Sequence, residues 1–176
     1  MISDDRLRFE ALYALHQRTV WAYVRRRADP DAVEDAVAET FLVAWRRLED
    51  LPGDELPFLL GTARRVLANQ RRSTRRAGAL ASRVAGQTAT SVPDPSLGVD
   101  EADAVRAAVG RLGDQDREAL TLVAWEGLEP AQAAKAAGCS APTFAVRLHR
   151  ARRRLSAELE RMSFPTLADP SPEVLR

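Results

Sequence analysis

The stretch Glu129–Leu155, EPAQAAKAAGCSAPTFAVRLHRARRRL, decides the fold of the C-terminal part of this chain. Pro130 suits the first turn of a short helix, because the N–H that proline lacks would be unpaired there in any case. Gly138 suits a left-handed helix end, and Ser140 suits the N-cap of a following helix. The stretch therefore predicts two helices joined by a tight turn, with three small residues where the helices cross: Ala133, Ala134 and Ala137.

The second of these helices has an apolar face and a basic face. Its apolar residues recur at steps of three or four, which is typical of a buried stripe: Phe144, Leu148, Ala151, Leu155 and Leu159. Another face carries polar residues at the same steps, namely Thr143, Arg147, Arg150 and Arg154, flanked by His149, Arg152 and Arg153. Such a helix fits the major groove of DNA. The alternative is a basic face that is merely solvated, since short helix-turn-helix matches also arise by chance.

Charge is segregated along the chain. The net charge is only +1, from 26 basic and 25 acidic residues, so the protein is not a general polycation. Arginines cluster at Arg25–Arg27, Arg64–Arg76 and Arg147–Arg154, and Lys135 is the only lysine. Arginine favours bidentate contacts with phosphate and guanine, although a bias of this kind equally fits a GC-rich genome.

Composition excludes several classes of protein. Hydrophobic residues make up 45% of the chain, which supports packed cores, but no run of about 18 apolar residues exists, so we expect no membrane insertion. The N-terminal residues lack the apolar core of a signal peptide. The single cysteine, Cys139, cannot form an internal disulfide, which fits a cytoplasmic location. Cys139 is interpreted as a small buried filler, with a redox sensor as the alternative.

Apolar periodicity and breaking residues divide the chain into two helical units. The expected helices span 4–27, 30–48 and 57–76 in the first unit, and 101–112 and 115–125 ahead of the helix-turn-helix in the second. Asp29-Pro30-Asp31 is interpreted as a cap followed by a first helical turn. We predict an all-α fold with two small domains, 4–77 and 101–161, joined by a flexible linker at 78–100 and followed by a tail at 162–176.

The same periodicity predicts which side chains are buried. In the first unit these are Val33, Val37, Phe41, Ala44 and Leu48 of the second helix, and Leu59, Ala63, Val66 and Leu67 of the third. In the helix at 115–125 they are Leu120 and Val123. Gly127 is expected to help end that helix.

Motifs for catalysis and for cofactors are missing from the sequence. It contains no glycine-rich phosphate loop and no CxxC or HExxH motif, and its two histidines, His16 and His149, are far apart. Asp35 and Glu39 form an i,i+4 carboxylate pair, which we interpret as an exposed patch for a protein partner rather than as an acid/base or metal pair. We therefore expect no catalytic residue, no metal and no cofactor, and an enzyme is the weak hypothesis.

Three stretches, taken in order, resemble one family. AVEDAVAETFLVAWRRL (Ala32–Leu48) resembles the signature helix of the extracytoplasmic-function (ECF) sigma factors of the sigma-70 family, and PFLLGTARRVLANQRRSTRR (Pro57–Arg76) resembles the helix that follows it. The block Leu112–Leu155 resembles the C-terminal domain of that family. Together they cover most of the chain apart from linker and tail.

The resemblance implies two partners, core RNA polymerase and promoter DNA. It implies that the signature helix docks on the clamp of the polymerase largest subunit, through Asp35, Glu39, Phe41 and Trp45. It further implies that the loop at 49–56, with Arg64, Arg65 and Asn69, captures melted bases of the minus-ten element. The recognition helix would read the minus-thirty-five element through Thr143, Arg147, Arg150 and Arg154. An anti-sigma factor is a further partner that the family implies without identifying it.

Some positions depart from the family pattern. The family commonly has Trp where Phe58 stands and Asn where Arg65 stands, and that asparagine helps to hold a flipped base. Ala145-Val146 replaces a polar pair in the recognition helix, and Pro142 replaces glycine. Base readout at the minus-thirty-five element would then depend more on Thr143, Arg147 and DNA shape.

Two other functions compete with that of a sigma factor. The first is a helix-turn-helix regulator that binds operator DNA by itself, usually as a dimer. The second is an interaction adaptor that does not contact DNA. A sigma factor needs core polymerase to bind promoter DNA well, whereas a repressor does not. At the residue level, plain core packing is the favoured interpretation of Phe41, which shares a stripe with Val37 and Ala44.

Overall fold

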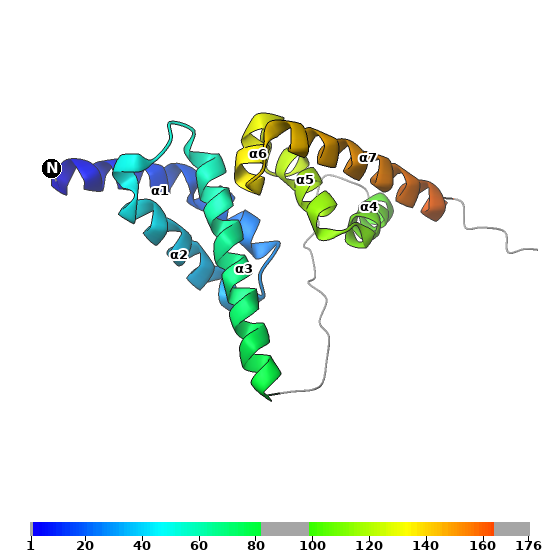
Figure 1. The fold of residues 1–176 in the computed structure, drawn as a ribbon, viewed down its shortest axis with the longest axis horizontal. Coiled ribbons are helices and arrows are strands. Elements are labelled where there is room, and N and C mark those ends of the chain that lie inside the picture. Colours follow the sequence, from blue (N-terminus) through cyan, green and yellow to red (C-terminus); the bar gives the residue numbers. More distant parts are fainter. Residues whose placement is uncertain (1, 82–98, 164–176) are drawn as a thin grey trace, which may run out of the picture.

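The computed structural model describes residues 2–81 and 99–163, and every regular element within them is helical, as the sequence predicts. Helices α1 to α3 form one unit and α4 to α7 form the other (Figure 1). Most of the predicted linker and nearly all of the predicted tail lie outside the described residues.

The N-terminal unit consists of α1 (Ile2–Arg25), α2 (Val33–Arg46) and α3 (Glu55–Ala81). The helix expected at 30–48 is shorter, because short 3-10 turns at Pro30–Ala32 and Leu48–Asp50 flank α2. Asp29 was expected to cap this helix, but its side chain makes no capping hydrogen bond, and Ala32 occupies the N-cap position of α2. The proline therefore starts a separate turn rather than the helix itself.

The predicted stripe of α3 forms the centre of this unit. All four expected residues are buried, and Leu60 is buried beside them, where α3 packs on α1 and α2: Leu59, Ala63, Val66 and Leu67. In α2 the stripe is shifted slightly, because Ala36 and Thr40 are buried while Val37 is only half-buried. Thr40 satisfies its hydroxyl by donating to the Ala36 carbonyl at 2.7 Å, which makes a buried polar side chain acceptable at this position.

The C-terminal unit consists of α4 (Val99–Arg111), α5 (Asp114–Ala124), α6 (Pro130–Ala137) and α7 (Ala141–Ser163). Pro130 lies in the first turn of α6, and Gly138 ends that helix in the left-handed region at φ 69°. The Ser140 hydroxyl accepts the Thr143 backbone N–H at 3.3 Å. These three observations confirm the helix-turn-helix that the sequence predicts.

The core of the second unit lies between α7 and the helices α4, α5 and α6. Phe144, Leu148 and Ala151 are buried on the expected face of α7. The prediction for α5 was only partly right, since Leu120 and Leu122 are buried whereas Val123 is half-buried. Because α6 and α7 both pack on α5, its buried face is wider than a single stripe.

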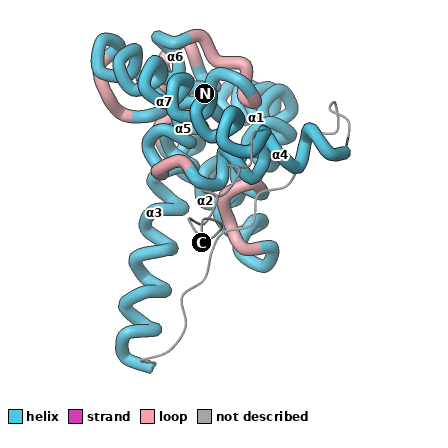
Figure 2. The backbone as a smooth tube through the Cα atoms, turned by 90° about the vertical axis from the view of Figure 1, so that its right-hand side faces the viewer, coloured by secondary structure: helices cyan, strands magenta, loops and turns pink. Residues whose placement is uncertain are grey.

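The two units touch through α3 and α6, which lie side by side in Figure 1. Figure 2 shows the C-terminal part of α3 extending away from the other helices. The backbones approach so closely that a Cβ atom on Gly61 would lie 3.2 Å from the Ala136 carbonyl oxygen. Glycine and alanine are the residues that permit such a crossing. The alanines of α6 therefore serve two contacts, one with α7 and one with the N-terminal unit.

Candidate nucleic-acid interface

The outer surface of α2 combines acidic and apolar side chains. Asp35 and Glu39 are exposed, and Trp45 is 40% exposed and packs edge-on against Phe9, with ring centres 5.1 Å apart. Leu42 is 46% exposed beside them, a member of this surface that the sequence analysis missed. The sequence could have indicated this, because Leu42 stands three residues before Trp45 and residues at i and i+3 share a helix face.

Phe41 belongs to the core rather than to this surface. Only 3% of it is exposed, and its ring lies 4.7 Å from that of Tyr13 and 6.4 Å from that of Phe9. Core packing, the interpretation favoured from the sequence, accounts for it. Phe41 supports the surface from beneath by fixing the aromatic side chains of α1.

The polar residues of α3 differ in solvent exposure and in their hydrogen-bond partners. Arg64 is half-buried and donates from Nε to the Ala136 carbonyl at 3.2 Å, across the contact between the units. Arg65 is exposed and donates from Nε to the Gly61 carbonyl of its own helix at 3.0 Å. Asn69 is exposed and accepts from Arg72 at 2.5 Å. Arg65 and Asn69 therefore face solvent, whereas Arg64 faces the second unit.

The predicted polar stripe of α7 lies on the flank of the helix. Arg150 donates to Asp116 Oδ1 from Nε at 3.1 Å and from Nη2 at 2.9 Å, and Arg154 donates to Oδ2. The Asp116 side chain is 2% exposed. Burial alone would raise its pKa, but the hydrogen bonds and charges of the two arginines outweigh burial and lower the pKa below its usual value. Arg150 and Arg154 thus tie α7 to α5.

The most outward face of α7 is centred elsewhere. Val146 is 69% exposed, and His149 and Arg153 are also exposed. At 100° per residue these positions lie opposite the buried Phe144 and Leu148. The sequence could have indicated this outward face, because its residues lie opposite the apolar stripe that the sequence predicts. Of the predicted stripe, Thr143 is exposed and shares a 2.8 Å hydrogen bond with the Ser140 hydroxyl, whereas Arg147 is half-buried.

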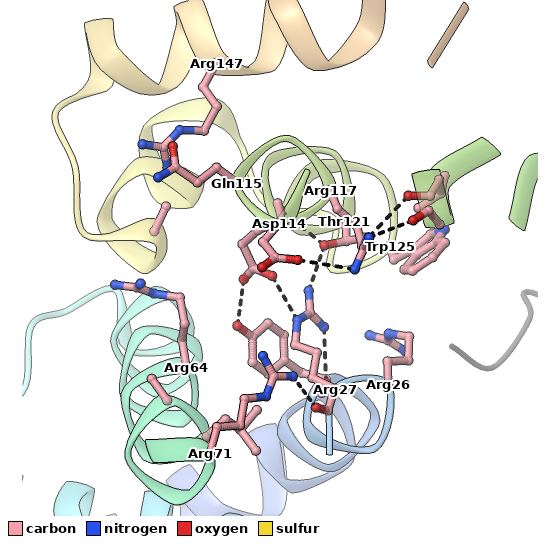
Figure 3. Close-up of a pocket in the computed structure, with 17 residues that line it drawn as sticks. Arg26, Arg27, Arg64, Arg71, Asp114, Gln115, Arg117, Thr121, Trp125 and Arg147 are labelled. Atoms are coloured by element: carbon pink, nitrogen blue, oxygen red, sulfur yellow. Dashed lines mark hydrogen bonds and ion pairs between the residues drawn. The ribbon is translucent and has the colours of Figure 1, made fainter. Parts of the chain in front are cut away.

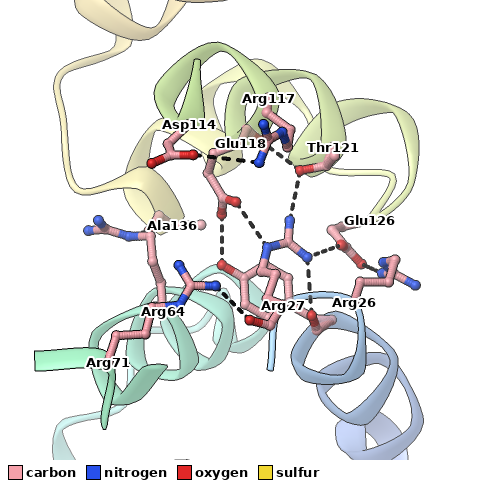
Figure 4. A network of polar contacts seen from close by, with 11 residues as sticks. Arg26, Arg27, Arg64, Arg71, Asp114, Arg117, Glu118, Thr121, Glu126 and Ala136 are labelled. Atoms are coloured by element: carbon pink, nitrogen blue, oxygen red, sulfur yellow. Dashed lines mark hydrogen bonds and ion pairs between the residues drawn. The ribbon is translucent and has the colours of Figure 1, made fainter. Parts of the chain in front are cut away.

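A network of ion pairs joins the C-terminal end of α1 to α5 and the turn after it (Figure 4). Arg27 donates to Glu118 at 3.0 Å, to Glu126 at 3.3 Å and to the Thr121 hydroxyl at 2.7 Å. Arg26 donates to Glu126 at 2.5 Å. The Glu126 side chain is only 1% exposed, so these pairs are largely withdrawn from water.

Tyr23 completes the network by donating its hydroxyl to Glu118 at 2.7 Å. Burial raises the pKa of Tyr23 well above its ordinary value, so the phenol keeps the proton that it donates. For Arg27, burial alone would lower the pKa, but the neighbouring Tyr23, Glu118 and Glu126 outweigh burial and raise it. In the sequence, Arg25–Arg27 are visible only as a basic cluster, and no periodic signal indicates a partner about 90 residues away.

The loop before α3 also reaches the second unit. Asp54 accepts from Gln132 of α6 at 3.2 Å, and Lys135 lies 3.9 Å from its second oxygen. Gln132 in turn accepts the Glu129 backbone N–H at 3.0 Å in the capping box of α6. This loop is the segment for which the resemblance implies a role in capturing bases.

An open cavity of about 410 Å³ lies between the units, and six of its 17 lining residues are arginines (Figure 3). The arginines come from the turn after α1 and from α3, α5 and α7: Arg26, Arg27, Arg64, Arg71, Arg117 and Arg147. The sequence shows these residues as three separate clusters and one isolated position. Only the packing of the two units brings them together.

His16 lies 3.4 Å from Glu55, and Cys139 is a free, half-buried thiol. No group of three or more potential ligands for a metal ion occurs among the residues that the structure describes. None of the described helices is long and apolar enough to cross a bilayer.

Comparison with known proteins identifies both units. Residues 12–77 match the family model of sigma-70 region 2, and residues 102–155 match that of sigma-70 region 4. The chain is 33% identical over 157 residues to the ECF RNA polymerase sigma factor EcfG of Rhodopseudomonas palustris, covering 88% of this chain and 86% of that protein. The chain belongs to the ECF sigma factors of the sigma-70 family.

A second relative of this sigma factor is NccH of Alcaligenes xylosoxydans xylosoxydans, 30% identical over 169 residues and 89% of each chain. CnrH, solved in complex with the cytosolic domain of CnrY, matches with a TM-score of 0.59 at 27% identity over 86% of this chain and 87% of CnrH. The fold also matches RpoE of Bartonella quintana, solved with the anti-sigma factor NepR, with a TM-score of 0.70 at 24% identity over 86% of this chain and 96% of RpoE. The protein is a transcription initiation factor and not an enzyme.

Proposed function

We propose that this sigma factor binds core RNA polymerase and directs it to promoters, with one unit serving each element of the promoter. The observation that carries the proposal is the match of both units to the two sigma-70 regions, in order, within one chain. We take the domains to be 4–77 and 101–161, joined by 78–100. The cytoplasm is the compartment in which such a factor would meet polymerase.

The α2 surface is the proposed polymerase contact. Asp35 and Glu39 supply charge, Trp45 supplies an exposed aromatic face, and Phe41 supports it from the core. Exposed aromatic residues flanked by charge are typical of protein interfaces. The two relatives solved with regulatory partners, RpoE with NepR and CnrH with CnrY, support the proposal that this chain also has an anti-sigma partner.

Promoter DNA is the proposed ligand of α3 and α7. Arg64, Arg65 and Asn69 are proposed to contact the minus-ten element, and the exposed positions of the latter two favour this role. In α7 the proposed contacts to the minus-thirty-five element are Thr143, Arg147, Arg150 and Arg154. Arg150 and Arg154 would share their donors between Asp116 and phosphate, because a guanidinium has five N–H donors.

In-vitro transcription tests the proposal against a stand-alone regulator. Purified core polymerase, the full chain and a pool of genomic promoter fragments should yield specific transcripts that are absent without the chain. Binding of the same fragments should be strong only when polymerase is present. Strong, site-specific binding without polymerase, combined with no transcript in its presence, would instead favour an operator-binding regulator.

A further inference from the structure

The cavity between the two units has the size of a small-ligand site. Its volume of about 410 Å³ falls within the roughly 300–1,000 Å³ of known ligand pockets. Both units contribute walls, with α1 and α3 on one side and α5 and α7 on the other (Figure 3). A ligand in this cavity would therefore contact both units at once.

Positive charge dominates the lining. Six arginines line the cavity, against two carboxylates, Asp114 and Glu118. Glu118 is already engaged, because it accepts from Tyr23 at 2.7 Å and from Arg27 at 3.0 Å. Asp114 lies at the rim, where it is 96% exposed and 3.5 Å from Arg117. The lining therefore carries positive charge that its own carboxylates do not neutralise.

Three of the arginines have donors to spare. Among the side chains that the structure describes, no carboxylate forms an ion pair with Arg64, Arg71 or Arg147. Arg64 and Arg71 each donate to one backbone carbonyl, those of Ala136 and Arg27.

A fourth arginine of the lining is also incompletely satisfied. The buried Nε of Arg26 finds no acceptor in the described part of the chain. Buried donors are ordinarily satisfied in folded proteins, so the lining is suited to a ligand that brings acceptors.

We propose that this cavity binds a small polyphosphate anion of about nucleotide size. Arg64 and Arg71 of α3 and Arg147 of α7 would donate to its oxygens, because a guanidinium matches phosphate geometry with paired N–H donors. Phosphate chains of this kind occur both in nucleoside triphosphates and in inorganic polyphosphate. The bound anion would hold the two units together.

Anion binding would also oppose DNA binding, and this part of the inference rests on the proposed function. Arg64 and Arg147 are proposed DNA contacts, and both line the cavity. An anion held by these arginines would occupy donors that promoter DNA needs. The site would thereby couple promoter binding to the supply of a phosphate compound.

Calorimetric titration of the full chain tests the site without polymerase or DNA, so its result is independent of whether promoters are recognised. The ligands are sodium tripolyphosphate, ATP, GTP and orthophosphate at constant ionic strength, which keeps general screening equal. We expect saturable 1:1 binding of one or more phosphate chains, with orthophosphate at least about ten-fold weaker, because it reaches fewer arginines. A preference for ATP or GTP over tripolyphosphate would assign the source as a nucleotide, and the reverse would assign inorganic polyphosphate.

A matched pair of double variants locates the site. Arg64→Gln with Arg147→Gln should weaken binding about 100-fold, or about ten-fold for each arginine that is replaced. Arg46→Gln with Arg153→Gln removes the same charge from exposed positions outside the cavity, one in each unit, and should leave binding unchanged. Circular dichroism melting checks that both variants fold.

Three outcomes would overturn the inference. The first is the absence of saturable binding by any of the phosphate ligands. The second is equal weakening in the two double variants, which would show that general charge attracts the anion. The third concerns a single-stranded hexanucleotide. If it binds as tightly as the best phosphate ligand and loses as much affinity in the cavity variant, the arginines form a nucleic-acid surface instead.

Discussion

Asp116 is the residue that fixes the flank of α7, the proposed recognition helix. It projects from α5, is 2% exposed, and accepts hydrogen bonds from Arg150 and Arg154 of α7. A carboxylate buried to this extent is stable only because both of its oxygens are paired. Two arginines that the sequence presents as free for DNA are thus also part of the packing between α5 and α7.

Replacing Asp116 with Asn should lower stability in a pH-dependent way. The pKa of Asp116 is lowered in the folded state, so its charge stabilises the fold at pH values above the unfolded pKa of about 3.9 and ceases to do so as the pH falls through the folded value. At pH 7 we expect the free energy of unfolding to fall by about 1–2 kcal/mol. The loss stays this small because both arginines are about half exposed, so water can hydrate their guanidinium groups once the carboxylate is gone.

Thermal melting of wild type and Asp116→Asn between pH 2 and pH 7 measures this loss. The difference between the two proteins should be largest near pH 7 and should shrink toward pH 2. Asp103→Asn, at an exposed i,i+3 pair with Arg106, is the control and should change little. A difference that stays constant with pH would mean that charge on Asp116 is not the source of its effect.

Arg147 lies near the N-terminal end of α7, which is the part of a recognition helix that reaches base edges. Arg147→Ala should cost about 1–3 kcal/mol of promoter affinity and relax preference at one or two positions of the minus-thirty-five element. Holoenzyme binding to single-base promoter variants measures both effects. If every variant loses the same affinity, Arg147 is a phosphate clamp, and the exposed Thr143 or the shape of the DNA carries the sequence preference.

At the scale of single elements, α2 has a buried face that serves folding and an exposed face that is proposed to bind polymerase. Its buried residues are Val33, Ala36, Thr40, Phe41 and Ala44. Asp35 and Glu39 are exposed on the other side. Double replacement of these two residues by Ala should alter stability by no more than about 0.5 kcal/mol and should weaken core polymerase binding strongly.

Melting and a polymerase binding assay measure the two effects of this double variant separately. Glu49→Ala with Asp50→Ala changes the same charge at exposed positions of the following 3-10 turn and controls for charge alone. A large fall in melting temperature with intact polymerase affinity would reverse the assignment of Asp35 and Glu39.

The elements themselves were predictable from local signals. Helical periodicity identified Leu59, Ala63, Val66 and Leu67 as buried, and turn chemistry identified Gly138 and Ser140 as the end and start of helices. Periodicity was less reliable in α5, where Leu122 is buried and Val123 only half-buried. A short helix that is covered by two neighbours has no single apolar face for the sequence to reveal.

The site was predictable only in its local parts. Exposure of Asp35, Glu39 and Thr143 follows from the helical pattern, but the engagement of Arg150 and Arg154 by Asp116 does not. Ion pairs between residues far apart in sequence depend on how elements pack, and a charged residue looks the same in sequence whether it is solvated or paired. The arginine-lined cavity escaped the sequence analysis for the same reason.

At the scale of the whole molecule, the two units are held in contact by buried charge. Arg27 alone contacts Glu118, Glu126 and Thr121 of the second unit, and Arg64 reaches the Ala136 carbonyl. The minus-ten and minus-thirty-five elements lie more than two DNA turns apart, or about 70 Å at 34 Å per turn. If each unit reads one element, as proposed, we expect the units to move apart from the contact shown in Figure 1 when both elements are bound.

Arg27→Ala should favour that separation. Removing one partner of a buried ion pair leaves the other charge uncompensated, which costs about 3–5 kcal/mol in a closed structure. When the units separate, Glu118 and Glu126 are hydrated again and avoid most of this cost. The closed arrangement should therefore no longer be favoured in free energy over the separated one, while each unit stays folded. Small-angle X-ray scattering should then show a larger radius of gyration, with helical content by circular dichroism nearly unchanged.

The control for this experiment is Arg6→Ala in α1, the helix that precedes Arg27. Arg6 forms an exposed i,i+4 pair with Glu10 at 2.8 Å, and such pairs contribute little, so its loss should leave the radius of gyration as it is. A second measurement links the closed arrangement to function, because Arg27→Ala should bind promoter fragments more tightly than wild type in the absence of polymerase. An unchanged radius of gyration with a marked loss of helical content would contradict the prediction, since Arg27 would then stabilise the N-terminal unit itself rather than the contact between the units.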